Sequence, residues 1–139
     1  MKYEGIERKR FKRLKIPGAT VNFSQKHFKK RYSEEFCPVV DLSRGGIRFL
    51  CRDLVSTIVT KISMQIYIPG ESFYLNLKGR IKWSSLNPAE NYKYQIGVQF
   101  NPFGNKKEHN QPETLERIIA WERKLLTDNT QEKKERLEG

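Results

Sequence analysis

Cysteine and histidine are scarce in this sequence, and their positions argue against the common metal and thiol sites. The two cysteines, Cys37 and Cys51, lie in strand-like runs at no metal-site spacing, so we expect two buried thiols. The two histidines, His27 and His109, are far apart in polar surroundings. Neither a metal cluster nor a Ser-His or Cys-His catalytic pair can be drawn, and the sequence offers no candidate active site.

Long hydrophobic runs are also missing. No segment approaches the roughly 20 apolar residues that a membrane-spanning helix needs. The first stretch of the chain, residues 1–16, is highly charged, unlike a secretory leader. From these features we expect a soluble, cytoplasmic protein without a membrane span.

Acidic residues are outnumbered by basic ones. The 139 residues contain 16 Asp and Glu against 27 Lys and Arg, for a formal net charge of +11. Such a balance implies a polyanionic partner, which can be a nucleotide, a nucleic acid or an anionic membrane surface. The bases are concentrated near the start, where residues 1–16 form a predicted flexible basic arm. The length fits a single domain after this arm.

Short segments of alternating apolar and polar residues predict a mainly β domain. Pro-Gly pairs at 17–18 and 69–70 mark turns between them. Roughly six short strands with one apolar face each predict a small antiparallel β-barrel over residues 17–103. The clearest alternating segments are 19–23, 47–51, 62–68, 73–83 and 94–100.

The chain after the barrel divides into two parts. Residues 104–127 read as a charged linker followed by a helix, with Pro112 at its first position and apolar residues at helical spacing. We favour packing of this apolar face against the barrel, and the alternative is a partner or dimer surface. Residues 128–139 are charged without periodicity, which predicts a disordered tail.

A turn at residues 41–46 carries groups that suit a ligand. Asp41 supplies a carboxylate, Ser43 a hydroxyl, and Gly45 and Gly46 supply amides that no side chain blocks. A guanine has N–H donors for such a carboxylate, and O6 and N7 acceptors that favour Arg. The simpler alternative is that Asp41 and Ser43 bond their own turn backbone, and that one glycine supplies a positive φ.

Two motifs together resemble the PilZ domains, bacterial receptors for the second messenger cyclic di-GMP. Their signature is RxxxR near the domain start, followed by a (D/N)xSxxG turn. Asp41, Ser43 and Gly46 match the second motif, and in the first Arg13 matches while Lys9 stands where the first Arg is expected. The resemblance implies a six-stranded, split-type barrel and a receptor rather than an enzyme.

The resemblance also implies roles for the residues of the arm. The arm is expected to fold over the barrel when cyclic di-GMP arrives, with Arg13 pairing with phosphate or the guanine Hoogsteen edge. Lys9 would contribute a point charge, flanked by Arg8 and Arg10. In this family an Arg directly before the motif goes with a stacked ligand dimer, and Arg8 stands there, so two ligand molecules are the implied stoichiometry.

On the barrel, Asp41 would accept from the guanine Watson-Crick edge and Ser43 would bond base or phosphate. Gly46 would allow close approach of the ligand. Trp83 matches a frequent family aromatic that could stack on the ligand, although a place in the barrel core is an equal alternative. The expected ligand-binding residues are Arg8, Lys9, Arg10, Arg13, Asp41, Ser43, Gly46 and Trp83.

Two other functions stay open. One is a small β-barrel that binds RNA or DNA through a basic face. Asp41 argues against this, because a carboxylate within a phosphate-binding face is unfavourable, so we do not expect a nucleic-acid partner. The other is a degenerate PilZ scaffold that acts only through protein contacts, an alternative that Lys9 keeps open. The downstream protein partner is not identified by the sequence. The aromatic residues considered for stacking on nucleic acid are Tyr3, Phe11, Phe28 and Tyr32.

Overall fold

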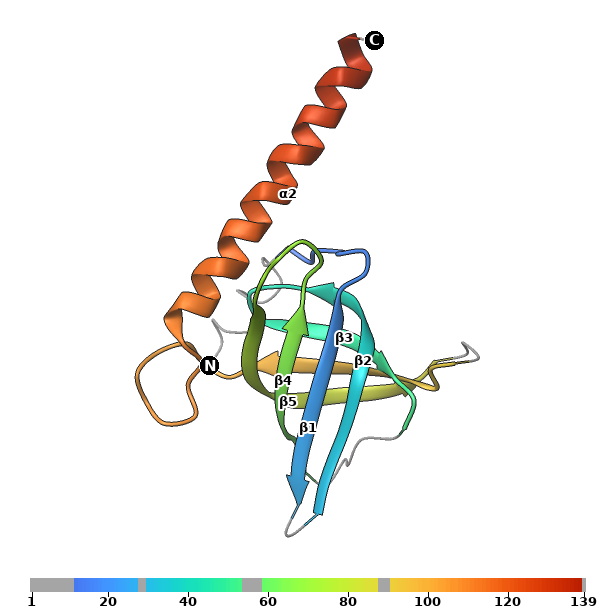
Figure 1. Cartoon of the computed structure of the whole chain (residues 1–139), viewed down its shortest axis with the longest axis vertical. Coiled ribbons are helices and arrows are strands. Elements are labelled where there is room, and N and C mark those ends of the chain that lie inside the picture. The colour runs from blue at the N-terminus through green and yellow to red at the C-terminus, as the bar shows by residue number, and fades with distance from the viewer. Residues whose placement is uncertain (1–11, 28–29, 54–58, 88–90, 139) are drawn as a thin grey trace.

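The computed structural model of the chain describes residues 12–27, 30–53, 59–87 and 91–138. Its centre is a closed barrel of antiparallel strands in the order β1-β2-β3-β6-β5-β4 (Figure 1). The predicted barrel and its C-terminal helix are confirmed. The strands are β1 (Thr20–His27), β2 (Lys30–Leu42), β3 (Gly46–Cys51), β4 (Lys61–Tyr67), β5 (Tyr74–Leu86) and β6 (Tyr94–Phe100).

Alternation along each strand fills the barrel with apolar side chains. In β4, Ile62, Met64 and Ile66 are at most 3% exposed, while the residues between them face outward. Leu75 and Leu77 of β5 face the same interior. Because successive side chains of a strand point to opposite faces, closing the sheet places one set inside and the other in solvent.

Two Pro-Gly turns lie close together. In residues 16–19 and again in 68–71, the N–H of the fourth residue donates to the carbonyl of the first at 3.1 Å. Gly18 and Gly70 have φ values of 81° and 89°, so each turn has Pro second and a left-handed Gly third, as a type II turn requires. A Cβ on Gly18 would lie 3.1 Å from Cγ of Pro69, so the two turns nearly touch.

The chain joins the barrel earlier than the sequence predicted. Leu14 and Leu42 exchange backbone hydrogen bonds of 2.7 and 3.0 Å. Leu14 and Ile16 belong to the apolar core, with exposed fractions of 6% and 5%. We predicted an arm over residues 1–16 because neighbouring charges hide these two apolar residues. Their burial moves the start of the barrel to residue 14 and places Arg13 directly beside it.

Helix α2 (Pro112–Glu138) begins at the predicted proline and packs its first turns on the barrel. Ile118 is 1% exposed and part of the core. The Trp121 indole N–H donates to the Glu71 carboxylate at 2.9 Å, and the guanidinium of Arg117 lies 3.9 Å from the Phe73 ring centre. These contacts agree with the favoured interpretation of the apolar face.

The later part of α2 extends away from the barrel (Figure 1). It includes residues 128–138, for which we predicted a disordered tail, and the structure describes their backbone as helix. The prediction weighed the density of charge, but Gln, Glu, Lys, Arg and Leu are good helix formers. In the part of the chain that the structure describes, no helix is long and apolar enough to cross a membrane.

The two cysteines are free and buried, as predicted. Burial raises the pKa of the Cys51 thiol to about 12, and burial and the neighbouring Glu34 carboxylate raise the pKa of Cys37. Since only the thiolate attacks disulfide reagents, we expect the native protein to react with dithionitrobenzoate near pH 8 more than about 100-fold more slowly than the unfolded chain. Absorbance traces with and without guanidinium chloride measure this ratio, and rapid reaction of the native protein would contradict it.

Candidate ligand-binding site

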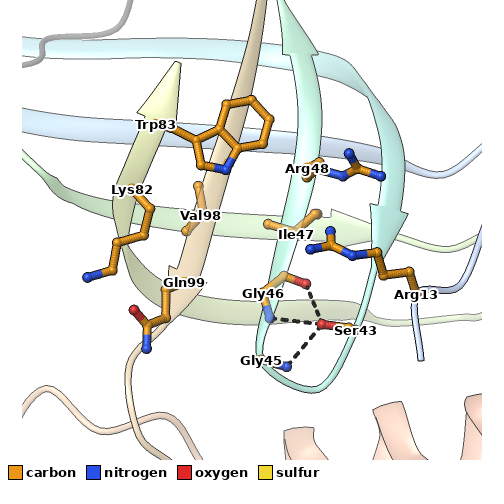
Figure 2. A pocket seen from close by; sticks show the side chains of 11 residues that line it. Arg13, Ser43, Gly45, Gly46, Ile47, Arg48, Lys82, Trp83, Val98 and Gln99 are labelled. Carbon is orange, nitrogen blue, oxygen red and sulfur yellow. Dashed lines mark hydrogen bonds between the residues drawn. The ribbon is translucent and has the colours of Figure 1, made fainter. Parts of the chain in front are cut away.

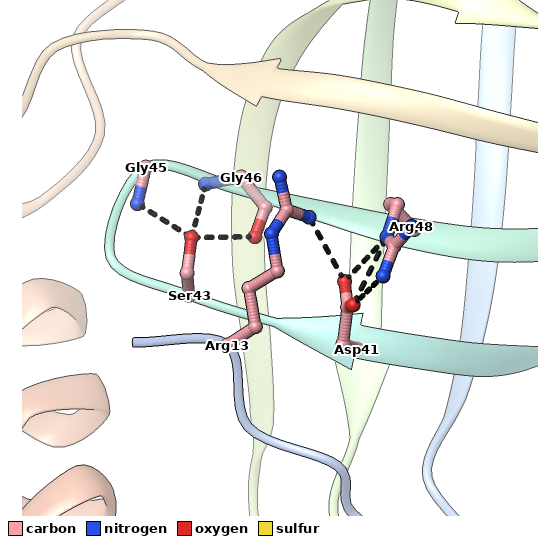
Figure 3. A network of polar contacts seen from close by, with 6 residues as sticks. All are labelled: Arg13, Asp41, Ser43, Gly45, Gly46 and Arg48. Atoms are coloured by element: carbon pink, nitrogen blue, oxygen red, sulfur yellow. Dashed lines mark hydrogen bonds and ion pairs between the residues drawn. The ribbon is translucent and has the colours of Figure 1, made fainter. Parts of the chain in front are cut away.

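The turn between β2 and β3 is organised by Ser43 (Figure 3). Its Oγ accepts hydrogen bonds from the N–H groups of Gly45 and Gly46, both at 3.2 Å. The simpler interpretation therefore holds for the Ser43 hydroxyl, which bonds its own turn. It fails for the glycines, because the described glycines with a positive φ are Gly18 and Gly70, not those of this turn.

Asp41 is buried, at 2% exposure, and does not bond its own turn. It faces Arg48 in the β2–β3 ladder, and Nε of Arg48 donates at 2.9 Å to both carboxylate oxygens. Nη2 of Arg48 also donates to Oδ2 of Asp41, and Nη1 of Arg13 lies 3.4 Å from Oδ1 (Figure 3). Hydrogen bonding to Asp41 raises the pKa of Arg48. The carboxylate is therefore held between two guanidinium groups.

Arg48 is a site residue that the sequence reasoning missed. It was assigned only to the alternating pattern of a strand. The available signal was the register of a tight hairpin, because pairing across the turn puts Arg48 directly opposite Asp41. Opposite charges at facing positions of two strands stabilise each other.

Position 46 requires glycine for a structural reason that differs from the predicted one. A Cβ at this position would overlap the carbonyl oxygen of Val98 in β6. The sequence assigned Gly46 to close approach of a ligand. The structure shows that glycine lets β3 approach β6 closely.

The place of Trp83 is decided by an irregularity in β5. The alternation that buries Leu75 and Leu77 would carry Trp83 into the core. The register shifts between Ile81 and Trp83, with Lys82 as the extra residue, and Trp83 is 42% exposed. A bulge re-aims the following side chain. The alternative of a core tryptophan is therefore wrong, because the bulge turns Trp83 to the outer face.

A row across three strands joins Trp83 to Arg48. Gly97 of β6 is paired with Arg48 on one side and with Trp83 on the other. A Cβ on Gly97 would overlap the indole ring, so the ring lies directly against the glycine. Gly97 thus provides the room in which the indole lies, one strand away from the guanidinium of Arg48.

These residues surround a pocket of about 180 Å³ (Figure 2). Of the predicted residues, Arg13, Ser43, Gly46 and Trp83 line it, and Asp41 contacts two of the lining arginines. Arg8, Lys9 and Arg10 lie outside the described residues. Residues of the lining that the sequence did not single out include Arg48, Lys82, Gly97 and Gln99.

The chemistry of the pocket suits a planar, anionic ligand. Arg13, Arg48 and Lys82 bring positive charge, and the guanidinium fork pairs with phosphate oxygens or with the acceptor edge of a guanine. Trp83 offers an indole for stacking. The arrangement can bind a nucleotide through its phosphates and its base together.

The tip of the turn is tied to helix α2. Nε and Nη2 of Arg44 donate to the two carboxylate oxygens of Glu122 at 2.9 and 3.2 Å. A bidentate pair of this kind restrains both partners in position as well as attracting them. The edge of the pocket formed by the turn is therefore braced by a residue far along the chain.

The contact between Gly97 and Trp83 predicts a rescue experiment. Gly97→Ala should destabilise the protein by about 2 kcal/mol, because the new methyl group overlaps the indole. Adding Trp83→Ala should restore most of that loss, since removal of the indole leaves room for the methyl. Urea unfolding of the two single variants and the double variant measures this coupling. Additive losses would contradict it.

Fold and site define a small β-barrel domain with a pocket on the outer face of its strands. The family model of the PilZ domain matches residues 7–121. The chain belongs to the PilZ domain family, whose members are ligand-binding receptors rather than enzymes.

Solved structures show the same fold at low sequence identity. The inhibitor of motility MotI/DgrA of Bacillus subtilis aligns with a TM-score of 0.58 and 12% identity over 86% of this chain and 52% of that one. MrkH of K. pneumonia in complex with c-di-GMP aligns with a TM-score of 0.62 and 14% identity, over 88% of this chain and 54% of MrkH. Apo MrkH aligns with a TM-score of 0.61 and 14% identity, over 87% of this chain and 52% of MrkH. The chain thus spans about half the length of these proteins, and no curated protein matches its sequence.

Proposed function

We propose that this chain is a receptor for cyclic di-GMP, bound at the pocket beside the β2–β3 turn. The observation that carries the proposal is the pair of arginines on one buried carboxylate, facing an indole across a glycine, in a PilZ domain. The MrkH structure, solved with c-di-GMP, supports the choice of ligand. The proposed place of action is the cytoplasm, and the free, buried cysteines are compatible with its reducing conditions.

The two arginines are reachable from solvent. The side chain of Arg13 is 62% exposed and that of Arg48 is 32% exposed. In the proposal Arg48, oriented by Asp41, takes a phosphate or the O6/N7 edge of guanine, and Trp83 stacks on the base. The main role of Asp41 in this proposal is to orient the guanidinium groups of Arg13 and Arg48.

A direct bond from guanine to Asp41 requires the exchange of one existing contact. Arg13 lies 3.4 Å from the carboxylate, whereas Nε of Arg48 lies at 2.9 Å, so the Arg13 contact is the weaker. The N–H groups of guanine replace Arg13, and Arg13 turns to a phosphate. Ser43 holds the turn by its hydroxyl throughout, instead of contacting the base.

The arm supplies the remaining contacts and the output. Arg8, Lys9 and Arg10 order over the ligand, and Arg8 favours a stack of two ligand molecules. Ordering the backbone costs roughly 1 to 2 kcal/mol for each residue, which ligand contacts must exceed. The ordered arm presents a ligand-dependent surface to a downstream partner in a motility, adhesion, secretion or polysaccharide machine.

Removal of residues 1–13 tests the arm. Leu14 and Ile16 stay in the truncated chain, so the core remains complete. We expect the same circular dichroism spectrum as the full chain and no cyclic di-GMP binding in calorimetry. Full-affinity binding by the truncated chain would contradict the role of the arm.

Calorimetric titration with cyclic di-GMP tests the receptor itself. Arg13→Ala should weaken binding by at least about tenfold through loss of a charge-assisted pair, while the adjacent control Lys12→Ala changes it less than about threefold. The stoichiometry decides between one and two ligand molecules. Absence of saturable binding at low and at physiological salt would overturn the proposal and leave a scaffold that acts through protein contacts.

A further inference from the structure

We infer that the outer face of β2, β1, β4 and the first part of β5 is a second binding surface, whose ligand is single-stranded nucleic acid. Figure 1 shows β4, β1 and β2 side by side on one side of the barrel. Five cations stand on this face, and we call them the cation row. Its members are Lys26, Arg31, Lys61, Lys78 and Arg80.

The cation row places like charges directly opposite one another. Lys26 is paired with Arg31 across β1 and β2, and Lys61 with Arg80 across β4 and β5. Like charges at facing positions destabilise a sheet. Among the residues that the structure describes, no ion pair involves a member of the cation row. A bound polyanion would relieve this repulsion.

The surface is grooved between these side chains. A groove of about 320 Å³ is lined by four of these cations, Lys26, Arg31, Lys61 and Lys78, and by one acid, Glu108. It continues into a second hollow of about 630 Å³, which shares Arg31 and Lys78. Besides the cations, these hollows are lined mainly by hydroxyl and amide side chains, which include Ser24, Ser63, Asn22, Gln65 and Asn76. The acidic residues of the lining are Glu35 and Glu108.

An aromatic pair stands at the other end of the same face. Tyr67 and Tyr74 are 37% and 50% exposed, with ring centres 6.1 Å apart in an edge-to-face arrangement. The seven residues from Lys61 to Tyr67 span about 20 Å along β4. Cations for phosphates, amides for base edges and aromatic rings for stacking thus follow one another along the strands, as single-strand binding requires. An anionic membrane or an acidic peptide would need the charges but not the amides and rings.

The sequence disfavoured a nucleic-acid partner because Asp41 was expected to lie within the phosphate-binding surface. Asp41 is buried beside the β2–β3 turn and lines neither hollow. The nucleotide pocket uses β3, β6 and the later part of β5, so the two surfaces share only that strand.

Fluorescence anisotropy of the full chain with labelled oligomers of deoxythymidine and uridine, at two salt concentrations, tests the proposal. We expect saturable binding that Lys26→Glu with Lys61→Glu weakens at least about tenfold. Each lost phosphate contact should lower the steepness of the salt dependence by about 0.7 in log K against log salt. Tyr67→Ala with Tyr74→Ala should also weaken binding about tenfold. The affinity for cyclic di-GMP should stay unchanged in both double variants.

A matched control carries the same change of charge elsewhere. Lys93→Glu with Lys124→Glu alters two exposed lysines that lie outside both hollows. We expect the affinity of this variant for the oligomers to fall less than about threefold. An equal loss in the control would show attraction by net charge alone and overturn the proposal. Binding to phosphatidylglycerol vesicles or to polyglutamate but not to the oligomers would also overturn it, in favour of a membrane or a protein partner.

Discussion

Asp41→Ala is expected to lower the affinity for cyclic di-GMP by at least about 100-fold, which corresponds to about 2.7 kcal/mol. The substitution removes the carboxylate that holds Arg48 and Arg13 at the pocket. It should also destabilise the fold by about 2 kcal/mol. Breaking a fully buried pair typically costs about 3 to 5 kcal/mol, but the Arg48 side chain is 32% exposed and can regain water.

Calorimetry and urea unfolding separate these two effects. Asp53→Ala is the control, because Asp53 is an exposed carboxylate in the loop after β3. A double-mutant cycle of Asp41→Ala with Arg48→Ala should show coupling in both binding and stability. If Asp41→Ala keeps full affinity, the carboxylate neither orients the arginines nor contacts guanine, and the site is wrong.

Gly46→Ala is expected to cost about 3 kcal/mol of folding stability and to remove ligand binding with it. The added Cβ would overlap the backbone carbonyl of Val98, which cannot move aside as a side chain can. Strand β3 would have to separate from β6, and the pocket lies across these two strands. Thermal unfolding followed by circular dichroism measures the loss.

Gly70→Ala serves as the comparison for Gly46→Ala. At Gly70 a Cβ meets no atom within 4 Å, and the cost comes only from the positive φ of 89°. We therefore expect a loss of about 1 kcal/mol. A smaller loss at Gly46 than at Gly70 would show that β3 and β6 are not packed as closely as the structure indicates.

Local pattern was sufficient for most of the architecture. Period-two alternation predicts β4, the first part of β5 and β6, because an inward side chain must be apolar wherever the strand lies in the barrel. The two Pro-Gly turns and the Pro112 helix start follow from the fixed φ of proline and the permissive φ of glycine. Charge density misled the prediction at residues 14–16, where Leu14 and Ile16 are buried.

The site was only partly readable from the sequence. Arg13, Ser43, Gly46 and Trp83 were singled out and do line one pocket, and Asp41 contacts two of its arginines. Arg48 was missed because its role in the site comes from its position opposite Asp41 on the neighbouring strand. The roles of Gly46 and Ser43 were assigned to a ligand, whereas the structure shows contacts within the protein.

The sequence by itself determined the barrel, its turns, the positive charge and the motif of the β2–β3 turn. Those properties depend on residues near one another along the chain. Only the tertiary structure decided that Arg48 holds Asp41, that a bulge turns Trp83 outward, and that the cations of four strands form one row. Each of these depends on strand register, which decides the residues that face one another across neighbouring strands and which the alternation along one strand does not specify.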